Sequence, residues 1–472
     1  MTNFYMYGLI IYLLFLLAIG VWASRRISDN VDFLVAGRRL GPLIMVGTIA
    51  GSFWGAGIFI AGPEMAYDLG YGLVLSILGS LFSAIILIFV LAAKLRKFAG
   101  LTIPDLLYER FRTPWMRGVG GIVVAELNII MLAVEILAGG TVLSLIFGWE
   151  FNTGLIFVTV VFLAYTFLGG FLAVAITDLI QSITMVVGLV IAIPFILIAT
   201  GGFSTMNASL AEMSPVHLDP FAGGFITPTL LIGWFIIFGL GNLGPYMLQR
   251  FYGARDQKTA VQGAAYGAAI GWLFMYLCIF LGVAAFVLFP DLERSAYAFP
   301  MLIMETLPPV LGVLLLSAGM AALISTSDSV LLTGSSALAH DLYASLIKKD
   351  ATPKQRLLAL RIGTIIIAVI SLLLALNWTG LVYWLQAFYN SIVASGFVPV
   401  IVAALYWKRA TKEAAIASLL GGSAAAIIWE SLGVPVEIVH PVYAGVIVAV
   451  LLLVVVSLIT PKPTSEELRR FF

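Results

Sequence analysis

The stretch GTIAGSFWGAGIFIAGP (residues 47–63) is apolar enough to lie in a membrane, yet glycine recurs through it and Pro63 ends it. A second stretch, IGWFIIFGLGNLGP (residues 232–245), has the same character. Glycine weakens a helix by about 1 kcal/mol relative to alanine, and proline removes a backbone donor. In lipid, a helix can be interrupted only where protein or a water-filled cavity satisfies the freed backbone groups. These two stretches therefore predict two broken membrane helices.

Two explanations fit these glycines. Gly47, Gly51 and Gly55 have the spacing of a small-residue packing motif between membrane helices. The two stretches are also the second and seventh apolar segments of the chain, five apart. Matched interruptions in two five-helix halves are typical of transporters built from inverted repeats. The matched positions favour this second explanation.

The composition indicates an all-α polytopic membrane protein. The chain has 472 residues, of which 61% are hydrophobic and 10% are charged, whereas a globular domain carries about 25% charged residues. A net charge of +1 gives no reason to expect a nucleic-acid partner. Three histidines and one cysteine leave little material for a metal site. The sequence also lacks a paired-histidine, Cys/His or Ser–His signature, so we do not expect an enzyme.

A helix crosses the hydrocarbon with about 20 apolar residues, and the chain contains thirteen such segments. They cover residues 4–24, 42–67, 73–94, 116–147, 152–168, 173–200, 228–250, 260–289, 299–342, 357–377, 380–407, 413–431 and 438–461. No basic region or small-residue cleavage site accompanies the first segment, so we expect a retained span rather than a signal peptide.

The basic residues predict the orientation. With thirteen spans, every lysine and arginine except Arg294 falls in loops or tails on one side. Cytoplasmic loops of membrane proteins are enriched in these residues. We therefore expect a plasma-membrane protein whose N-terminus is outside and whose C-terminus is cytoplasmic.

Polar side chains interrupt a later span at ISTSDSVLL (residues 324–332). Ala322, Ser325, Thr326 and Ser329 share one helical face, and Asp328 lies beside it. Hydroxyl and carbonyl oxygens are hard ligands that suit alkali cations, and unwound helices supply further carbonyls. Membrane serines also bond to the carbonyl four residues earlier without any other role, but that accounts poorly for five consecutive polar residues.

Among the acidic residues within apolar segments, Glu126, Glu135, Asp178 and Asp328 are the candidates for function. A carboxylate at mid-bilayer costs on the order of 3 kcal/mol, so each is a candidate for function. Asp178 can instead lie at the membrane boundary in contact with water. Glu126 and Glu135 can instead face a packed or hydrated interior.

Four motifs together resemble the sodium:solute symporter family, which includes proline, pantothenate, sialic acid, sugar and choline transporters. They are YTFLGGFLAVAITDLIQ (165–181), AALISTSDSVLLTGSSALAHDLY (321–343), WGAGIFIAGPEMAY (54–67) and LQRFYGARD (248–256). The third is most similar to the choline-transporter branch. The resemblance extends over nearly the whole chain.

The resemblance implies a ten-helix core of two inverted five-helix repeats, with broken first and sixth core helices. One extra helix and a cytoplasmic loop then occupy residues 1–41, and the first repeat occupies 42–200. An extracellular loop (201–227) separates it from the second repeat (228–407). Two further helices and a short cytoplasmic tail form residues 408–472.

The resemblance also implies sodium as the co-transported ion. The shared sodium site of the family falls here on carbonyls of Gly51, Trp54 and Ala322 and on hydroxyls of Ser325 and Thr326. A further sodium site found in some members falls on Asp178, Ser325, Asp328 and Ser329. Those members carry serine in place of Asp328, so here two carboxylates either bind the ion more tightly or share a proton.

The solute is expected at mid-membrane between the broken helices. The residues placed there are Trp54, Gly55, Gly57, Asn128, Glu135, Gly241 and Tyr246. Trp54 matches an aromatic of the choline cage and can make a cation–π contact, or it is a gate or packing residue. The other cage tryptophans are missing: one is replaced by Gly244, and the fourth span has none. Choline therefore stands beside amino acids and small carboxylates as a candidate.

The predicted function is sodium-coupled symport of a small organic solute by alternating access, with a monomer in the lipid bilayer sufficient for transport. Two alternatives remain. One is proton coupling through Asp178 and Asp328. The other is an ion channel, which does not concentrate solute.

Overall fold

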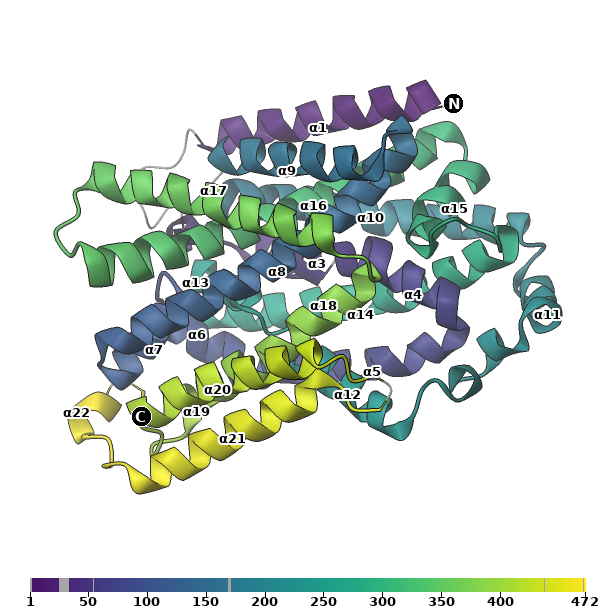
Figure 1. The fold of residues 1–472 in the computed structure, drawn as a ribbon. Coiled ribbons are helices and arrows are strands. Elements are labelled where there is room, and N and C mark those ends of the chain that lie inside the picture. The colour runs from purple at the N-terminus through teal and green to yellow at the C-terminus, as the bar shows by residue number, and fades with distance from the viewer. Residues whose placement is uncertain (1, 25–33, 54, 169–170, 437, 470) are drawn as a thin grey trace.

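The computed structural model of the chain describes residues 2–24, 34–53, 55–168, 171–436, 438–469 and 471–472. These residues form a bundle of helices, and their one β-type feature is a single bridge between Leu40 and Ala254. The start of α1 and the short C-terminal helix α22 lie at opposite ends of the bundle (Figure 1). The predicted all-α class is confirmed for the described residues.

The α-helices follow one another along the chain as α1 (Thr2–Ser24), α3 (Pro42–Phe53), α4 (Gly62–Leu69), α5 (Val74–Ile85), α6 (Ala92–Phe98), α7 (Ile103–Phe111), α8 (Pro114–Phe147), α9 (Phe151–Leu168), α10 (Phe171–Ala199), α11 (Phe203–Met213), α12 (Pro228–Leu240), α13 (Pro245–Gly253), α14 (Gln257–Leu288), α15 (Ala298–Thr306), α16 (Pro309–Ser336), α17 (Pro353–Asn377), α18 (Val382–Ile392), α19 (Val398–Tyr406), α20 (Lys412–Ser431), α21 (Pro441–Ile459) and α22 (Ser465–Leu468). Wider π-helical turns are η2 (Gly57–Ala61), η4 (Ile86–Leu91), η8 (Ala337–Ile347) and η9 (Val393–Phe397).

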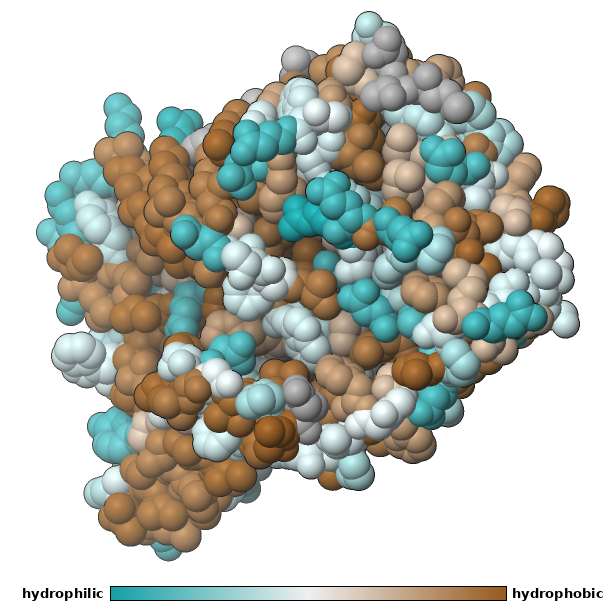
Figure 2. All heavy atoms as spheres, turned by 45° about the vertical axis from the view of Figure 1, so that its right-hand side comes forward, coloured by the Kyte–Doolittle hydropathy of each residue, from teal (hydrophilic) through white to brown (hydrophobic). Residues whose placement is uncertain are grey.

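The described chain contains ten helices that are long and apolar enough to cross a membrane, together with three shorter apolar helices at Phe4–Ile19, Pro42–Phe53 and Phe151–Thr166. Many large apolar side chains point outward, among them Phe89, Ile198 and Ile459. Figure 2 shows broad hydrophobic areas on the flank of the molecule, with hydrophilic side chains gathered toward the end turned forward. This surface suits lipid around the bundle. The count of thirteen spans, the inverted repeats and the division into five regions remain predictions.

Both glycine-rich stretches are interrupted in the structure. Helix α3 ends at Phe53, the chain bends at Gly55, and η2 leads into α4. Helix α12 ends at Leu240, and α13 begins only after Gly244, whose backbone is extended. A side chain at position 241 would collide with Cα and Cβ of Asn390 on α18. Glycine is therefore required there by close packing.

Two segments depart from the expected pattern. The predicted span 299–342 is divided into α15 and α16, because the pair Pro308–Pro309 stops one helix and starts the next. The polar stretch 95–115 contains a helix of its own, α7. Thr102 caps this helix by accepting from the backbone N–H of Asp105, whose carboxylate accepts from the Thr102 N–H in return.

The packing of five helices positions the site. Helix α3 packs against α10 and α14, while α16 packs against α8 and α10. The first break, the polar stretch of α16 and the acid-bearing segments of α8 and α10 therefore lie in contact inside the bundle.

Candidate functional site

The polar stretch of α16 is wholly inside the protein. Residues 325–329 are each no more than 4% exposed. Ser327 donates to the Leu323 carbonyl (2.8 Å) and Ser329 to the Ser325 carbonyl (3.1 Å). Bonding back to the helix therefore accounts for two of the hydroxyls. The Thr326 hydroxyl is buried with no partner among the described residues.

Asp178 on α10 is the centre of a buried network. Its carboxylate accepts from the Thr48 hydroxyl (Oγ1–Oδ2 2.5 Å) and from the Ser325 hydroxyl. It also forms an ion pair with Arg250, with 2.8 Å between Nη1 and Oδ2. Neither side chain of this pair is exposed. Asp178 therefore lies in the interior and not at the water boundary.

Arg250 is a site residue that was not predicted from the sequence. Counted among the basic loop residues, it instead lies in α13 with none of its surface exposed. It donates to Asp178, to Thr48 and, through Nη2, to the Ser329 hydroxyl (2.9 Å). The motif LQRFYGARD contains it, and its position directly after the second break was the available signal. A fixed positive charge therefore lies among the residues of the predicted second sodium site.

Three of the four residues of the predicted second sodium site lie together, and Asp328 points away from them. Asp178, Ser325 and Ser329 share the Arg250 network. The Asp328 carboxylate is turned toward α9, where its Oδ1 accepts from the Thr166 hydroxyl (2.6 Å). Its other oxygen is buried with no partner among the described residues. A second sodium ion remains a prediction, and it would have to displace Arg250 from Asp178.

The shared sodium site is better placed. Gly51 on α3 lies against Asp178, since a Cβ there would be 3.3 Å from the Asp178 Cβ. Ala322, Ser325 and Thr326 are buried on α16. Trp54 lies outside the described residues, but its neighbour Gly55 lies against the Thr326 hydroxyl. The first break and the polar face of α16 therefore lie in contact, and the shared sodium site remains a prediction.

A cavity opens beside the two breaks. Gly55 and Tyr246, two of the residues predicted for the solute site, line it. Of the other predicted residues, Asn128 is buried against its own helix and donates to the Val124 carbonyl (2.6 Å). Gly241 packs on α18, and Gly57 begins η2.

One wall of this cavity was not predicted. Gln386 and Asn390 of α18 line it together with Asn242. The Gln386 side-chain oxygen and the Asn390 side-chain nitrogen are buried without a partner among the described residues. Their spacing of four residues puts them on one helical face, which was the missed signal. The apolar part of the lining includes Phe53, Met131, Phe238, Met247 and Met275.

Glu135 lies beside the cavity, one helical turn from Met131 on α8. Its side chain is completely buried. Both carboxylate oxygens accept from a single donor, the backbone N–H of Ala56, at 3.1 Å. Glu126, on the same helix, is half-buried and distant from this contact. The structure therefore brings Glu135 to the first break and leaves Glu126 outside the site.

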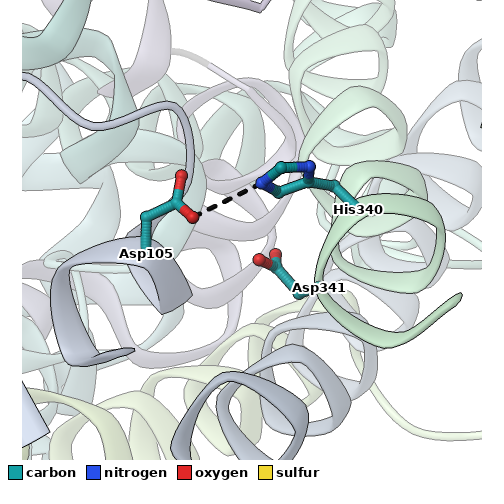
Figure 3. A group of neighbouring side chains, drawn as sticks. All are labelled: Asp105, His340 and Asp341. Atoms are coloured by element: carbon teal, nitrogen blue, oxygen red, sulfur yellow. Dashed lines mark hydrogen bonds and ion pairs between the residues drawn. The ribbon is translucent and has the colours of Figure 1, made fainter. Parts of the chain in front are cut away.

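A second acidic cluster joins α7, α8 and η8 away from the breaks. Figure 3 shows Asp105 and Asp341 facing the same space as the His340 ring, which lies 3.4 Å from Asp105. Arg117 pairs with Asp105, and its Nε is 3.7 Å from Asp341. Burial raises the pKa of Asp105, but the hydrogen bond to His340 and the charges of His340 and Arg117 outweigh it and lower the pKa to about 2. Three potential metal ligands meet here, yet Arg117 already supplies a positive charge. The cluster is therefore an ion-pair connection between these elements.

Comparison with known proteins places these features in context. The sodium:solute symporter family model matches residues 33–422. The osmoregulated proline transporter OpuE of Bacillus subtilis (strain 168) is 28% identical, with 98% of this chain and 96% of the relative covered. A sodium/proline symporter of Staphylococcus aureus (strain NCTC 8325 / PS 47) is 27% identical, with 96% and 92% covered. A Na+-coupled sialic acid symporter in a substrate-bound outward-open state has a similar fold, with a TM-score of 0.80 at 20% identity and 98% of each chain covered.

Proposed function

Because the chain belongs to the sodium:solute symporter family and is therefore a multi-pass sodium-coupled transporter rather than an enzyme, we propose that it takes up a small amino acid by alternating access. One observation carries this proposal. The unpartnered Thr326 hydroxyl, the first helix break and a mixed polar and apolar cavity lie together inside the bundle. An ion bound at the break would join α3 to α16 and hold open the state that accepts solute.

For the shared sodium site we propose carbonyls of Gly51, Trp54 and Ala322 with the hydroxyls of Ser325 and Thr326. Support comes from the burial of Ala322, Ser325 and Thr326 on one face of α16 and from the contact of Gly51 with Asp178. The Ser325 hydroxyl donates to Asp178, so its oxygen lone pairs remain available to a cation.

For the solute, the lining of the cavity favours a small amino acid. The unpartnered Asn390 side-chain nitrogen can donate to a carboxylate and the unpartnered Gln386 side-chain oxygen can accept from an ammonium group, while the methionines and phenylalanines of the lining accept an apolar body. Named relatives transport proline, so proline is the first compound to test. Choline and small carboxylates remain the other candidates.

The test is uptake by the purified chain in proteoliposomes. Labelled proline, other small amino acids, choline and small carboxylates are offered with an inward sodium gradient, an inward proton gradient or neither. We expect one compound class to accumulate above its outside concentration only with sodium. Accumulation driven by protons alone would favour the alternative through Asp178 and Asp328, and equilibration without accumulation would favour a channel.

We also propose that the N-terminus is outside and the C-terminus cytoplasmic. The basic residues support this orientation, and the two ends lie on opposite sides of the bundle (Figure 1). A reporter fused after Phe472 should be active in the cytoplasm, while a tag before Met1 should be accessible from outside. Both ends on one side would contradict an odd number of spans.

A further inference from the structure

Glu135 is a buried carboxylate without a cation among the described residues. The comparable acid, Asp178, has Arg250 at 2.8 Å. Among the described residues, Glu135 has only the Ala56 N–H as a hydrogen-bond partner, and both of its oxygens share it. An isolated charge in a low-dielectric interior is costly, and buried charges are normally paired or bound to a metal ion. Such a carboxyl otherwise takes up a proton, so this position calls for a proton or for a bound cation.

A second oxygen faces the same point. A Cβ built on Gly55 would contact the Glu135 Oε1 and would lie 3.0 Å from the Thr326 Oγ1. That hydroxyl is fully buried and has no hydrogen-bond partner among the described residues. An anionic oxygen and a neutral oxygen thus flank a space that only glycine leaves open. Such oxygens are hard ligands suited to an alkali cation.

The backbone around this space can complete the coordination. Gly55 lies in the bend between α3 and η2, and its own carbonyl accepts from the Phe59 N–H (3.4 Å), so further ligands would come from other carbonyls of the broken segment. Glu135 on α8 and Thr326 on α16 each supply a side-chain oxygen. The space therefore lies between α8, α16 and the Gly55 bend. Gly55 also lines the solute cavity, which places the space next to the solute.

We propose that Glu135 is the anionic ligand of the transported sodium ion, bound between the Gly55 bend and the Thr326 hydroxyl. This proposal rests on sodium-coupled transport as the function and changes the role predicted for Glu135 from solute contact to ion contact. The sodium charge is balanced by Glu135, because the Asp178 charge is balanced within the protein by Arg250. The ion then lies against the cavity, where it can also orient the carboxylate of an amino acid.

The test measures sodium binding in the absence of any solute. Purified full-length chain, wild type and Glu135→Gln, is titrated with radioactive sodium ions in a scintillation-proximity assay. We expect Glu135→Gln to weaken sodium binding more than tenfold. The matched control is Glu126→Gln, on the same helix but outside the site, which should bind sodium like the wild type. Elution volume and thermal unfolding confirm that each variant is folded.

A second variant keeps the carboxylate and fills the space. Gly55→Ala places a methyl group against the Glu135 carboxylate and near Thr326, so it should also weaken solute-free sodium binding more than tenfold. It carries the test if Glu135→Gln does not fold. Wild-type sodium binding in either folded variant would overturn the proposal. If Glu135→Gln bound sodium with unchanged affinity but had a raised KM for solute, Glu135 would instead contact the ammonium group of the solute.

The same experiment separates the two proposals. If the wild-type chain neither binds sodium nor accumulates solute on a sodium gradient, the proposed function fails and this inference fails with it. If the wild type does both and Glu135→Gln does so with unchanged sodium affinity, only the role of Glu135 is wrong.

Discussion

Asp178 and Glu135 are both completely buried near the first helix break, yet their surroundings differ in the source of positive charge. Asp178 has an internal cation, Arg250, and two hydroxyl donors from separate helices. Glu135 has one backbone N–H. A buried ion pair is stable only while both members are present. The difference indicates that Asp178 organises the core, while Glu135 is left to receive an ion.

The largest expected effect comes from breaking the internal pair. Arg250→Met removes the cation and leaves Asp178 buried without its partner, which should destabilise the folded protein by about 3–5 kcal/mol. Asp178→Asn should also destabilise, because it leaves Arg250 unpaired. The double variant should be more stable than the sum of the two single effects predicts. Thermal unfolding of the four proteins in the same detergent measures this cycle.

The prediction is contradicted if the stability losses of Arg250→Met and Asp178→Asn simply add in the double variant. If the two substitutions act independently, or if Arg250→Met unfolds at the wild-type temperature, Asp178 and Arg250 do not stabilise each other. Asp178 would then be available for a second sodium ion, and the contrast with Glu135 would disappear.

The next effect concerns the ion site itself. Ser325→Ala with Thr326→Ala removes two hydroxyls while keeping small side chains that suit a helix. Sodium affinity should fall more than tenfold, which corresponds to over ~1.4 kcal/mol. Sodium-dependent uptake measures the effect. Ser327→Ala is the matched control, since that hydroxyl bonds only its own helix. Unchanged sodium dependence in the double variant would reassign the polar stretch to the solute or to a proton path.

The next prediction concerns the number of sodium ions transported with each solute molecule. If Arg250 keeps the place beside Asp178, one sodium ion should accompany each solute. In proteoliposomes, the membrane potential that just opposes a known sodium and solute gradient gives this ratio directly. A ratio of two would show that Arg250 leaves Asp178 during the cycle and that the predicted second site fills.

The sequence predicted the elements of this arrangement but not their pairing. Glycine spacing located both breaks, and a run of hydroxyls located the face of α16, because each is a local pattern with a local cause. Arg250 was taken for a loop residue because a count of charges cannot tell a basic residue at a span end from one turned into the core. Gln386 and Asn390 were overlooked because only the packing of α18 against the breaks gives their polar groups a role.

The smallest expected effect lies in the Asp105 cluster, where Arg117 again supplies an internal cation, but near the surface. The Arg117 and Asp105 side chains are 20% and 12% exposed, so Asp105→Asn should destabilise the protein less than breaking the fully buried Asp178–Arg250 pair does. The lowered pKa of Asp105, about 2 against a usual 3.8, fixes the pH dependence. A carboxyl whose pKa is lower in the folded state stabilises the fold above its unfolded pKa, and this contribution is lost as the pH falls toward 2. His340 gains a proton over the same range, so the difference in unfolding temperature between wild type and Asp105→Asn should grow from pH 8 to about 5 and shrink only in stronger acid. A difference that vanished between pH 8 and 5 would mean that Asp105 is not held ionised by His340 and Arg117.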